Sequence, residues 1–184
     1  MRIIGGKYKG RRITPPRNFK ARPTTDFARE GLFNILNNRL DFESINVLDL
    51  FAGTGSISYE FASRGTPVIH LVEKDSRHIA GIRTIIKEYE FSGIRPVHID
   101  VKAFLKTCSV KYDFVFADPP FDLPWLKDLP DIVTGADIIK EGGFFVLEHP
   151  KGISFNEHKS FFEHRNYGGV NFSFFKPVIA EDQT

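Results

Sequence analysis

From residue 45 onward, short apolar runs of strand length alternate with longer stretches of helical periodicity. The runs that we expect to form strands are 45–51, 68–73, 95–99, 112–117 and 144–148. The stretches that we expect to form helices between them are about 56–64, 76–91, 101–107 and 126–140. Because short buried strands separated by helices are typical of parallel sheets, the pattern predicts a doubly wound α/β domain.

The two ends of the chain follow other patterns. Near the C-terminal end, 159–167 and 170–176 flank Gly168-Gly169 and predict an antiparallel hairpin that closes the sheet. At the N-terminal end, 2–6 and 10–14 predict two short strands around a turn.

A helix is expected to follow these N-terminal strands. Residues 24–26, Thr-Thr-Asp, supply an N-cap and an early acid. Apolar residues then recur at three- and four-residue steps, at Ala28, Leu32, Ile35, Leu36 and Leu40. One helix face should therefore pack on the core, with Arg29 and Glu30 on other faces. We expect 1–40 to form an N-terminal extension of an α/β domain that spans 41–184.

Charge is distributed unevenly along the chain, although the net charge is only +2. Residues 1–29 hold nine of the 25 lysines and arginines but one of the 23 acids. A basic segment on a mildly acidic domain predicts that a polyanion is held beside a site with a different task. A solvated tail that keeps the protein soluble is the alternative.

Several classes of protein are disfavoured by composition. The single cysteine, Cys108, excludes an internal disulfide framework, and the six histidines show no metal-ligand spacing, so we expect no metal. No stretch approaches the ~18 consecutive apolar residues of a membrane span. We expect a cytoplasmic protein with no membrane partner.

A glycine-containing loop follows the first expected strand. Residues 49–56 read Asp-Leu-Phe-Ala-Gly-Thr-Gly-Ser, and the two glycines allow a tight turn and close approach of a ligand to the backbone. A dinucleotide fingerprint needs a third glycine where this chain has Ser58. Asp49 could pair with a ligand's ammonium group, which S-adenosylmethionine has and NAD lacks.

Acids end the next two expected strands. Glu73 lies twenty residues after Gly53, where it could hold two ribose hydroxyls. Asp100 would lie near an adenine edge, or could cap the helix that follows. Ligands of such sheets bind outside the carboxyl ends of the strands, so these residues should share one site. The full set of expected cofactor-binding residues is Asp49, Phe51, Gly53, Gly55, Glu73, Lys74, Asp100 and Val101.

The tetrad Asp118-Pro119-Pro120-Phe121 comes directly after the fourth expected strand. Two prolines remove backbone donors and fix φ, which leaves carbonyls aimed into the site. A carboxylate and a carbonyl can together accept both hydrogens of an exocyclic amine, and Phe121 would stack on the base. A base from a duplex would have to be flipped out. A proline-rich turn with an incidental aspartate is the alternative.

With these motifs, the chain resembles the bacterial RsmD-type 16S rRNA (guanine-N2)-methyltransferases over nearly its whole length. The stretches that carry the resemblance are 2–6 with Gly10-Arg11, 22–26 with Arg29-Glu30, 49–55 and 118–121. The resemblance implies a Rossmann-like class I methyltransferase with a mostly parallel seven-stranded sheet. It also implies S-adenosylmethionine as cofactor and one guanine of small-subunit rRNA as substrate, in the subunit or in an assembly intermediate.

The resemblance also assigns roles to residues. Asp118, Pro119, Pro120 and Phe121 would be the catalytic residues, and the segment 22–25 would lie beside the methionine end of the cofactor. The residues that we expect to contact RNA are Arg2, Lys7, Lys9, Arg11, Arg12, Arg22, Thr24 and Thr25. We expect the protein to be a monomer.

Other functions stay open at this point. An adenine-N6 DNA methyltransferase, or a protein glutamine methyltransferase with an Asn-Pro-Pro-Tyr tetrad, would use a similar site. A non-catalytic rRNA-binding assembly factor could keep the same fold. An NAD oxidoreductase is disfavoured by Ser58 and Asp49. Whether Asp118 acts as a base or only positions the amine also stays open.

Overall fold

The computed structural model describes residues 1–14 and 25–178. Its centre is one seven-stranded sheet in the order β3-β2-β1-β4-β5-β7-β6. The strands are β1 (Asn46–Leu50), β2 (Val68–Glu73), β3 (Ile94–His98), β4 (Tyr112–Ala117), β5 (Ile139–His149), β6 (Phe161–Tyr167) and β7 (Val170–Phe175). Strands β1 to β5 are parallel, and β7 runs antiparallel to β5 and β6. The predicted α/β sheet with its closing hairpin is confirmed.

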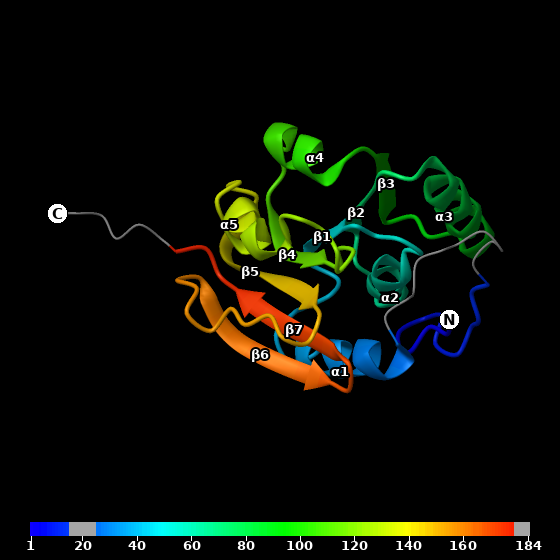
Figure 1. Ribbon diagram of the computed structural model, residues 1–184. Helices are drawn as coiled ribbons and strands as arrows, with labels where there is room; N and C mark the ends of the chain where they lie inside the picture. Colours follow the sequence, from blue (N-terminus) through cyan, green and yellow to red (C-terminus); the bar gives the residue numbers. More distant parts are fainter. Residues whose placement is uncertain (15–24, 179–184) are drawn as a thin grey trace.

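Helices cover both faces of this sheet (Figure 1). They are α1 (Asp26–Leu36), α2 (Ser56–Ser63), α3 (Ser76–Tyr89), α4 (Val101–Thr107), the 3-10 helix η1 (Leu126–Asp128) and α5 (Leu129–Thr134). Val47 belongs to the hydrophobic cluster that includes residues of α1, α2 and α3, whereas its neighbour Leu48 belongs to the cluster that includes residues of α4 and α5. The central strands are buried on both sides, which explains their nearly continuous apolar sequences.

The strand order reverses between β1 and β4, which are direct neighbours. Asp49 lies opposite Phe116 and Leu50 lies opposite Ala117. The loops that follow β1 and β4 therefore leave the sheet side by side, at the switch point where such folds bind their ligands.

The N-terminal segment is tied to this core. The expected pair of strands is reduced to one antiparallel bridge, between Arg2 and Arg12. Gly6 and Gly10 have positive φ in the turn between them. Ile3 is 2% exposed and belongs to the same hydrophobic cluster as α1 and the sheet. The N-terminal segment is therefore packed against the domain through its buried apolar side chains.

The expected helix at 126–140 is wrong in its extent. Only η1 and α5 form there, and β5 already begins at Ile139. Pro130 lies in the first turn of α5, where its missing N–H is tolerated. Gly135 follows the helix and Asp137 has a φ of +52°, a left-handed conformation that cannot continue a helix. Helix α1 likewise ends at Leu36, before the expected Leu40.

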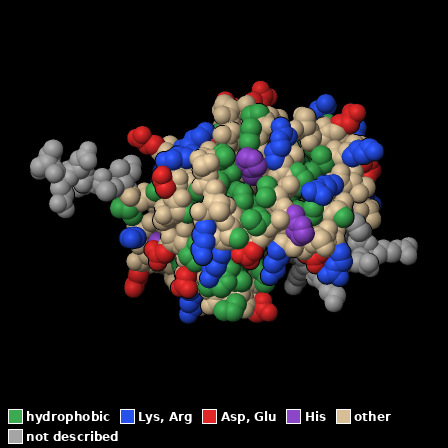
Figure 2. Space-filling model, turned by 90° about the horizontal axis from the view of Figure 1, so that it is seen from above, with side chains coloured by type: hydrophobic (Ala, Val, Ile, Leu, Met, Phe, Trp, Pro, Cys, Tyr) green, Lys and Arg blue, Asp and Glu red, His purple; other side chains and the backbone are tan. Residues whose placement is uncertain are grey.

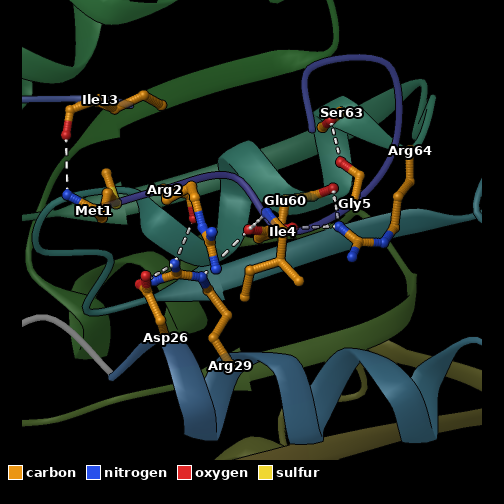
Figure 3. Close-up of polar contacts among 10 residues, drawn as sticks. All are labelled: Met1, Arg2, Ile4, Gly5, Ile13, Asp26, Arg29, Glu60, Ser63 and Arg64. Atoms are coloured by element: carbon orange, nitrogen blue, oxygen red, sulfur yellow. Dashed lines mark hydrogen bonds and ion pairs between the residues drawn. The ribbon is translucent and has the colours of Figure 1, made fainter. Parts of the chain in front are cut away.

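The expected position of Arg29 off the core-packing face of α1 is also wrong. Its side chain is 1% exposed and donates to Glu60, to Asp26 and to the Arg2 carbonyl (Figure 3). Glu60 lies on α2, is itself 1% exposed, and also pairs with Arg64. A buried ion cluster therefore joins α1, α2 and the N-terminal segment.

Candidate active site

Four of the predicted acids lie along the carboxyl edge of the sheet. In the order of the strands they are Asp100 after β3, Glu73 at the end of β2, Asp49 in β1 and Asp118 after β4. Three steps between neighbouring strands span about 14 Å at ~4.8 Å per step. The sheet thus gathers residues from 49 to 118 at one ligand-sized edge.

Asp49 is a buried carboxylate whose described partners are neutral. It is 1% exposed, and Ser58 donates to its Oδ2 through both the backbone N–H (3.2 Å) and the hydroxyl (2.6 Å). Burial raises the pKa of Asp49 to about 7, the Ser58 hydrogen bonds oppose this shift, and the Glu73 carboxylate adds to it. No ion pair to Asp49 forms within the described part of the chain. A cation supplied by a ligand would relieve this buried charge.

Glu73 shapes the glycine loop. Its Oε2 accepts from the Gly53 N–H at 2.9 Å, and its Oε1 accepts from the Asp75 N–H at 2.8 Å. His78 lies 3.6 Å from the same carboxylate. The two carboxylate oxygens therefore fix the glycine loop on one side and the backbone that follows β2 on the other. The residue is still 8% exposed.

Tyr59 supports the loop from below. Gly55 has a φ of +80°, and a Cβ there would lie 2.8 Å from the Tyr59 ring. The Tyr59 hydroxyl is buried with no hydrogen-bond partner in the described structure. Its pKa lies well above the usual tyrosine value because of burial and the nearby Asp49 carboxylate. The loop therefore needs glycine at position 55.

Aromatic rings continue from Tyr59 toward the N-terminal turn. Tyr59 stacks on Phe91 with ring centroids 5.5 Å apart, and Phe91 contacts Tyr8 edge to face at 5.0 Å. The Arg11 guanidinium lies 5.1 Å from the Tyr8 ring. We call Tyr8, Phe91 and Tyr59 the aromatic run.

The remaining predicted cofactor residues flank this loop or the next strand ends. Phe51 has a φ of +57° and lies 5.8 Å from the Trp125 ring. Asp100 caps α4 by accepting from the N–H groups of Lys102 and Ala103, as one of its two predicted roles required. The other two residues differ in exposure, since Val101 is buried and Lys74 is exposed.

The tetrad occupies the adjoining position after β4. Asp118 is half-buried, Pro119 is buried and Pro120 is exposed. The Pro120 carbonyl accepts from the Leu123 N–H at 2.9 Å, so this carbonyl closes a turn. Phe121 is 50% exposed, so its ring is accessible to a base.

The predicted RNA-contacting residues of the N-terminal turn at 2–12, which we call the basic turn, lie away from the glycine loop. The side chains of Arg2, Lys7, Lys9, Arg11, Arg12 and Thr25 are exposed, whereas Arg22 and Thr24 lie outside the described residues. The Lys7 N–H donates to the Ser63 carbonyl at the end of α2, whereas the glycine loop lies at the start of that helix. Eight helical residues separate these ends by about 12 Å. The basic turn therefore lies at some distance from the carboxyl edge.

Basic side chains also occur on other surfaces. Figure 2 shows lysines and arginines spread among acidic and hydrophobic side chains over the face seen from above. In the described ranges, no group of three or more His, Cys, Asp or Glu is placed to hold a metal ion. No described helix is both long enough and apolar enough to cross a membrane.

Sequence reasoning missed three residues of this region. In the sequence Ser58 stands out only as a missing glycine, yet it holds Asp49. Tyr59 has the pattern of an ordinary core residue of α2. Trp125 lies in a stretch without a recognised motif, although its ring contacts Phe51 and lies 4.3 Å from the Lys102 ammonium. Only the spacing of Ser58 and Tyr59 directly after the glycine loop could have indicated the first two.

The parallel sheet, its switch point and the loops gathered there define a Rossmann-like methyltransferase. The family model described as "Conserved hypothetical protein 95" matches residues 1–176, and the chain belongs to this family, the RsmD family of methyltransferases.

Known relatives agree with this assignment. "Putative rRNA methyltransferase YlbH" of Bacillus subtilis is 30% identical over 161 residues, which cover 85% of this chain and 86% of the relative. "Ribosomal RNA small subunit methyltransferase D" of Buchnera aphidicola is 30% identical over 150 residues, covering 81% and 78%. The solved structure of "Putative methyltransferase yhhF" from Escherichia coli has a TM-score of 0.81 at 26% identity and covers 95% of this chain and 96% of that one.

Proposed function

We propose that this protein transfers the methyl group of S-adenosylmethionine to the exocyclic N2 amine of a guanine in 16S rRNA. The observation that carries the proposal is the position of the Asp118–Phe121 tetrad directly beside the glycine loop at the switch point. The rRNA methyltransferase names of two relatives support the substrate class.

The residues at the carboxyl edge fit the proposed cofactor. Asp49 offers a buried carboxylate to an ammonium group, and the loop at Gly55 leaves no room for a side chain. Glu73 and Asp100 would face the ribose and the adenine. Phe51, Gly53, Lys74 and Val101 would complete the site. When bound, S-adenosylmethionine supplies a methyl group already activated by a sulfonium.

The tetrad would hold the base. We propose that the Asp118 carboxylate and the Pro119 carbonyl accept the two N–H groups of the amine, while Phe121 stacks on the ring. An amine lone pair is delocalised into the base, and holding both hydrogens favours a pyramidal nitrogen. Correct alignment supplies most of the catalysis, because the methyl group needs no further activation.

The basic turn would hold RNA phosphates. Its exposed side chains Arg2, Lys7, Lys9, Arg11 and Arg12 are suited to this role. We propose that residues 1–40 act as the RNA-binding extension of the domain at 41–184. We further propose that the protein works as a monomer in the cytoplasm, on the small ribosomal subunit or an assembly intermediate.

One experiment tests the reaction and its substrate together. Labelled S-adenosylmethionine is offered with naked 16S rRNA, assembled small subunits, DNA and protein, and the methylated nucleoside is identified by mass spectrometry. We expect N2-methylguanosine from rRNA or from subunits. Methyladenine in DNA, methylated glutamine, or no transfer to any substrate would contradict the proposal.

A further inference from the structure

A hollow of about 410 Å³ lies between α1 and the end of β6. Phe27 and Tyr167 contribute aromatic rings to its lining, and Glu30, Asn34 and Asn38 contribute polar side chains. We call this hollow the α1–β6 groove. The methyl transfer proposed above makes no use of it.

The aromatic wall of the groove is preorganised. The Tyr167 hydroxyl donates to the Gly31 carbonyl at 3.2 Å, and a Cβ at Gly31 would lie 2.1 Å from the Tyr167 ring. The Tyr167 ring therefore lies directly on the backbone of α1. Phe27 contacts it edge to face with centroids 5.8 Å apart and is 66% exposed. A fixed ring thus stands beside an exposed one.

One end of the groove, at Tyr167, lies at the same edge of the sheet as the tetrad. Tyr167 pairs with Val170 at the turn of the final hairpin, and the next residue, Asn171, pairs with His149 at the end of β5. From β4 to β6 there are three steps between neighbouring strands, about 14 Å at ~4.8 Å per step. An RNA strand bound at Asp118 could therefore reach Tyr167 without passing around the molecule.

The lining has the chemistry of a base-binding site. Among the described residues, Glu30 is a charged side chain that lines the groove, and no Lys or Arg lines it. The groove therefore does not suit a phosphate, which carries the same sign of charge as Glu30. Exposed aromatic rings bind the faces of bases, while amides and a carboxylate can pair with the N–H and carbonyl groups at base edges. Single-stranded RNA is commonly recognised in this way.

We propose that the α1–β6 groove binds an unstacked base of the substrate RNA, a few nucleotides from the target guanine. Phe27 and Tyr167 provide the stacking surface, and Glu30 and Asn34 face the edge of the base. The inference rests on the proposed function, because it takes the same RNA as ligand.

Variants of Phe27 test the stacking role. Phe27→Leu removes the ring and keeps an apolar side chain, and Phe27→Tyr restores the ring. Phe162→Leu is the matched control, because Phe162 is another exposed aromatic, 40% exposed, at the other end of β6. We expect Phe27→Leu to raise the KM for RNA about tenfold with kcat unchanged at saturating RNA. Phe27→Tyr and Phe162→Leu should retain the wild-type KM.

A fluorescent base separates stacking from a structural effect. 2-Aminopurine is placed in turn at each position near the target guanine, and fluorescence is measured on binding. The wild-type protein and Phe27→Tyr should quench it at one position, and Phe27→Leu should not. A wild-type KM together with wild-type quenching for Phe27→Leu would overturn the inference.

Two other results have separate meanings. If Phe27→Leu weakens methylation of assembled subunits but not of an RNA oligonucleotide, the groove binds protein, and the inference is overturned. If the wild-type protein methylates no RNA at all, the proposed function fails, whatever the variants of Phe27 do.

Discussion

Asp49 and Glu60 are two carboxylates that are equally hidden from solvent, at 1% exposure each, but differ in their partners. Glu60 accepts from the guanidinium groups of Arg29 and Arg64 and from the Ile4 N–H. Asp49 accepts from the backbone N–H and from the hydroxyl of Ser58, and both of these groups are neutral. Its pKa is raised to about 7 by burial.

We infer from these different partners that the Glu60 carboxylate stabilises the fold, whereas the Asp49 carboxylate is suited to pair with a ligand. A buried ion is costly unless paired, and the Glu60 cluster supplies its own counter-ions. Asp49 has no described counter-ion, which is the arrangement expected of a site that receives a cation from outside. The same distinction applies to arginines, since Arg29 is locked inside while Arg11 and Arg12 face solvent.

The largest effect on activity should come from the edge that is available to ligands. Asp118→Ala removes the carboxylate that we expect to position the amine, and kcat should fall about a thousandfold. Affinity for S-adenosylmethionine, measured by calorimetry, should stay close to that of the wild type. Asp131→Ala, at an exposed carboxylate, is the control. A mutant that keeps most of its activity would remove Asp118 from the mechanism.

The largest effect on stability should come from the paired acid. Glu60→Gln leaves Arg29 and Arg64 without their shared counter-ion, and unfolding free energy should fall by about 3 kcal/mol. Urea denaturation gives the value. Asp137→Asn breaks an exposed pair with Lys111 and should cost less than about 1 kcal/mol. Equal losses in the two variants would refute the assigned role of the cluster.

The unpaired acid should behave in the opposite way. Asp49→Asn removes a buried charge, so its unfolding free energy at pH 8 should be no lower than that of the wild type. Its affinity for S-adenosylmethionine should fall about tenfold to a hundredfold, because the ammonium group no longer meets a charged acceptor. Loss of stability without loss of affinity would place Asp49 with the structural charges.

The raised pKa of Asp49 should also appear in the pH dependence of stability. The folded-state pKa of Asp49, about 7, lies above the unfolded value near 3.8, so the folded state binds the extra proton. The Asp49 contribution should therefore lower unfolding free energy as pH rises from about 4 to 7, by up to ~4 kcal/mol. Denaturation of wild type and Asp49→Asn across this range measures it. Parallel curves would contradict the raised pKa.

Cofactor binding should show the matching proton linkage. An ammonium group beside Asp49 favours the carboxylate, so binding should release a proton below pH 7 and weaken as pH falls. Calorimetry in buffers with different ionisation enthalpies detects the released proton. Asp49→Asn should lose this proton release.

The smallest effect should come from the exposed arginines. Arg11→Gln with Arg12→Gln should weaken RNA binding and lower its log–log salt slope by roughly 1 for each phosphate that the variant no longer neutralises. Stability should change little, since both residues are exposed. An unchanged slope would show that the turn does not contact RNA.

Local sequence patterns were enough to predict the sheet and its edge. Glycines, apolar runs and strand-end acids act within a few residues, so the positions of β1, β2 and β4 and of the acid residues at their ends follow directly from the sequence. The early end of α5 also had local signals in the sequence, Gly135 and Asp137. The prediction of a helix up to residue 140 gave more weight to the apolar periodicity of the stretch than to these two residues.

Long-range contacts explain the features that were not predicted. Arg29 is buried because Glu60, 31 residues later, lies opposite it, and helical periodicity gives no sign of such a partner. The α1–β6 groove joins Phe27 to Tyr167, which only the completed sheet brings together. The shared carboxyl edge could be predicted because all parallel strands of a sheet end at the same edge. Individual side-chain pairs between distant parts of the chain could not be predicted in this way.

The aromatic run beneath the glycine loop couples four positions of the chain. Gly55 leaves space that Tyr59 fills, Tyr59 rests on Phe91, and Phe91 rests on Tyr8. At position 55 any side chain would meet the Tyr59 ring, and a smaller residue at position 8, 59 or 91 would leave space beside its aromatic neighbour. Across descendants of this chain, the four positions should therefore change together or remain as they are.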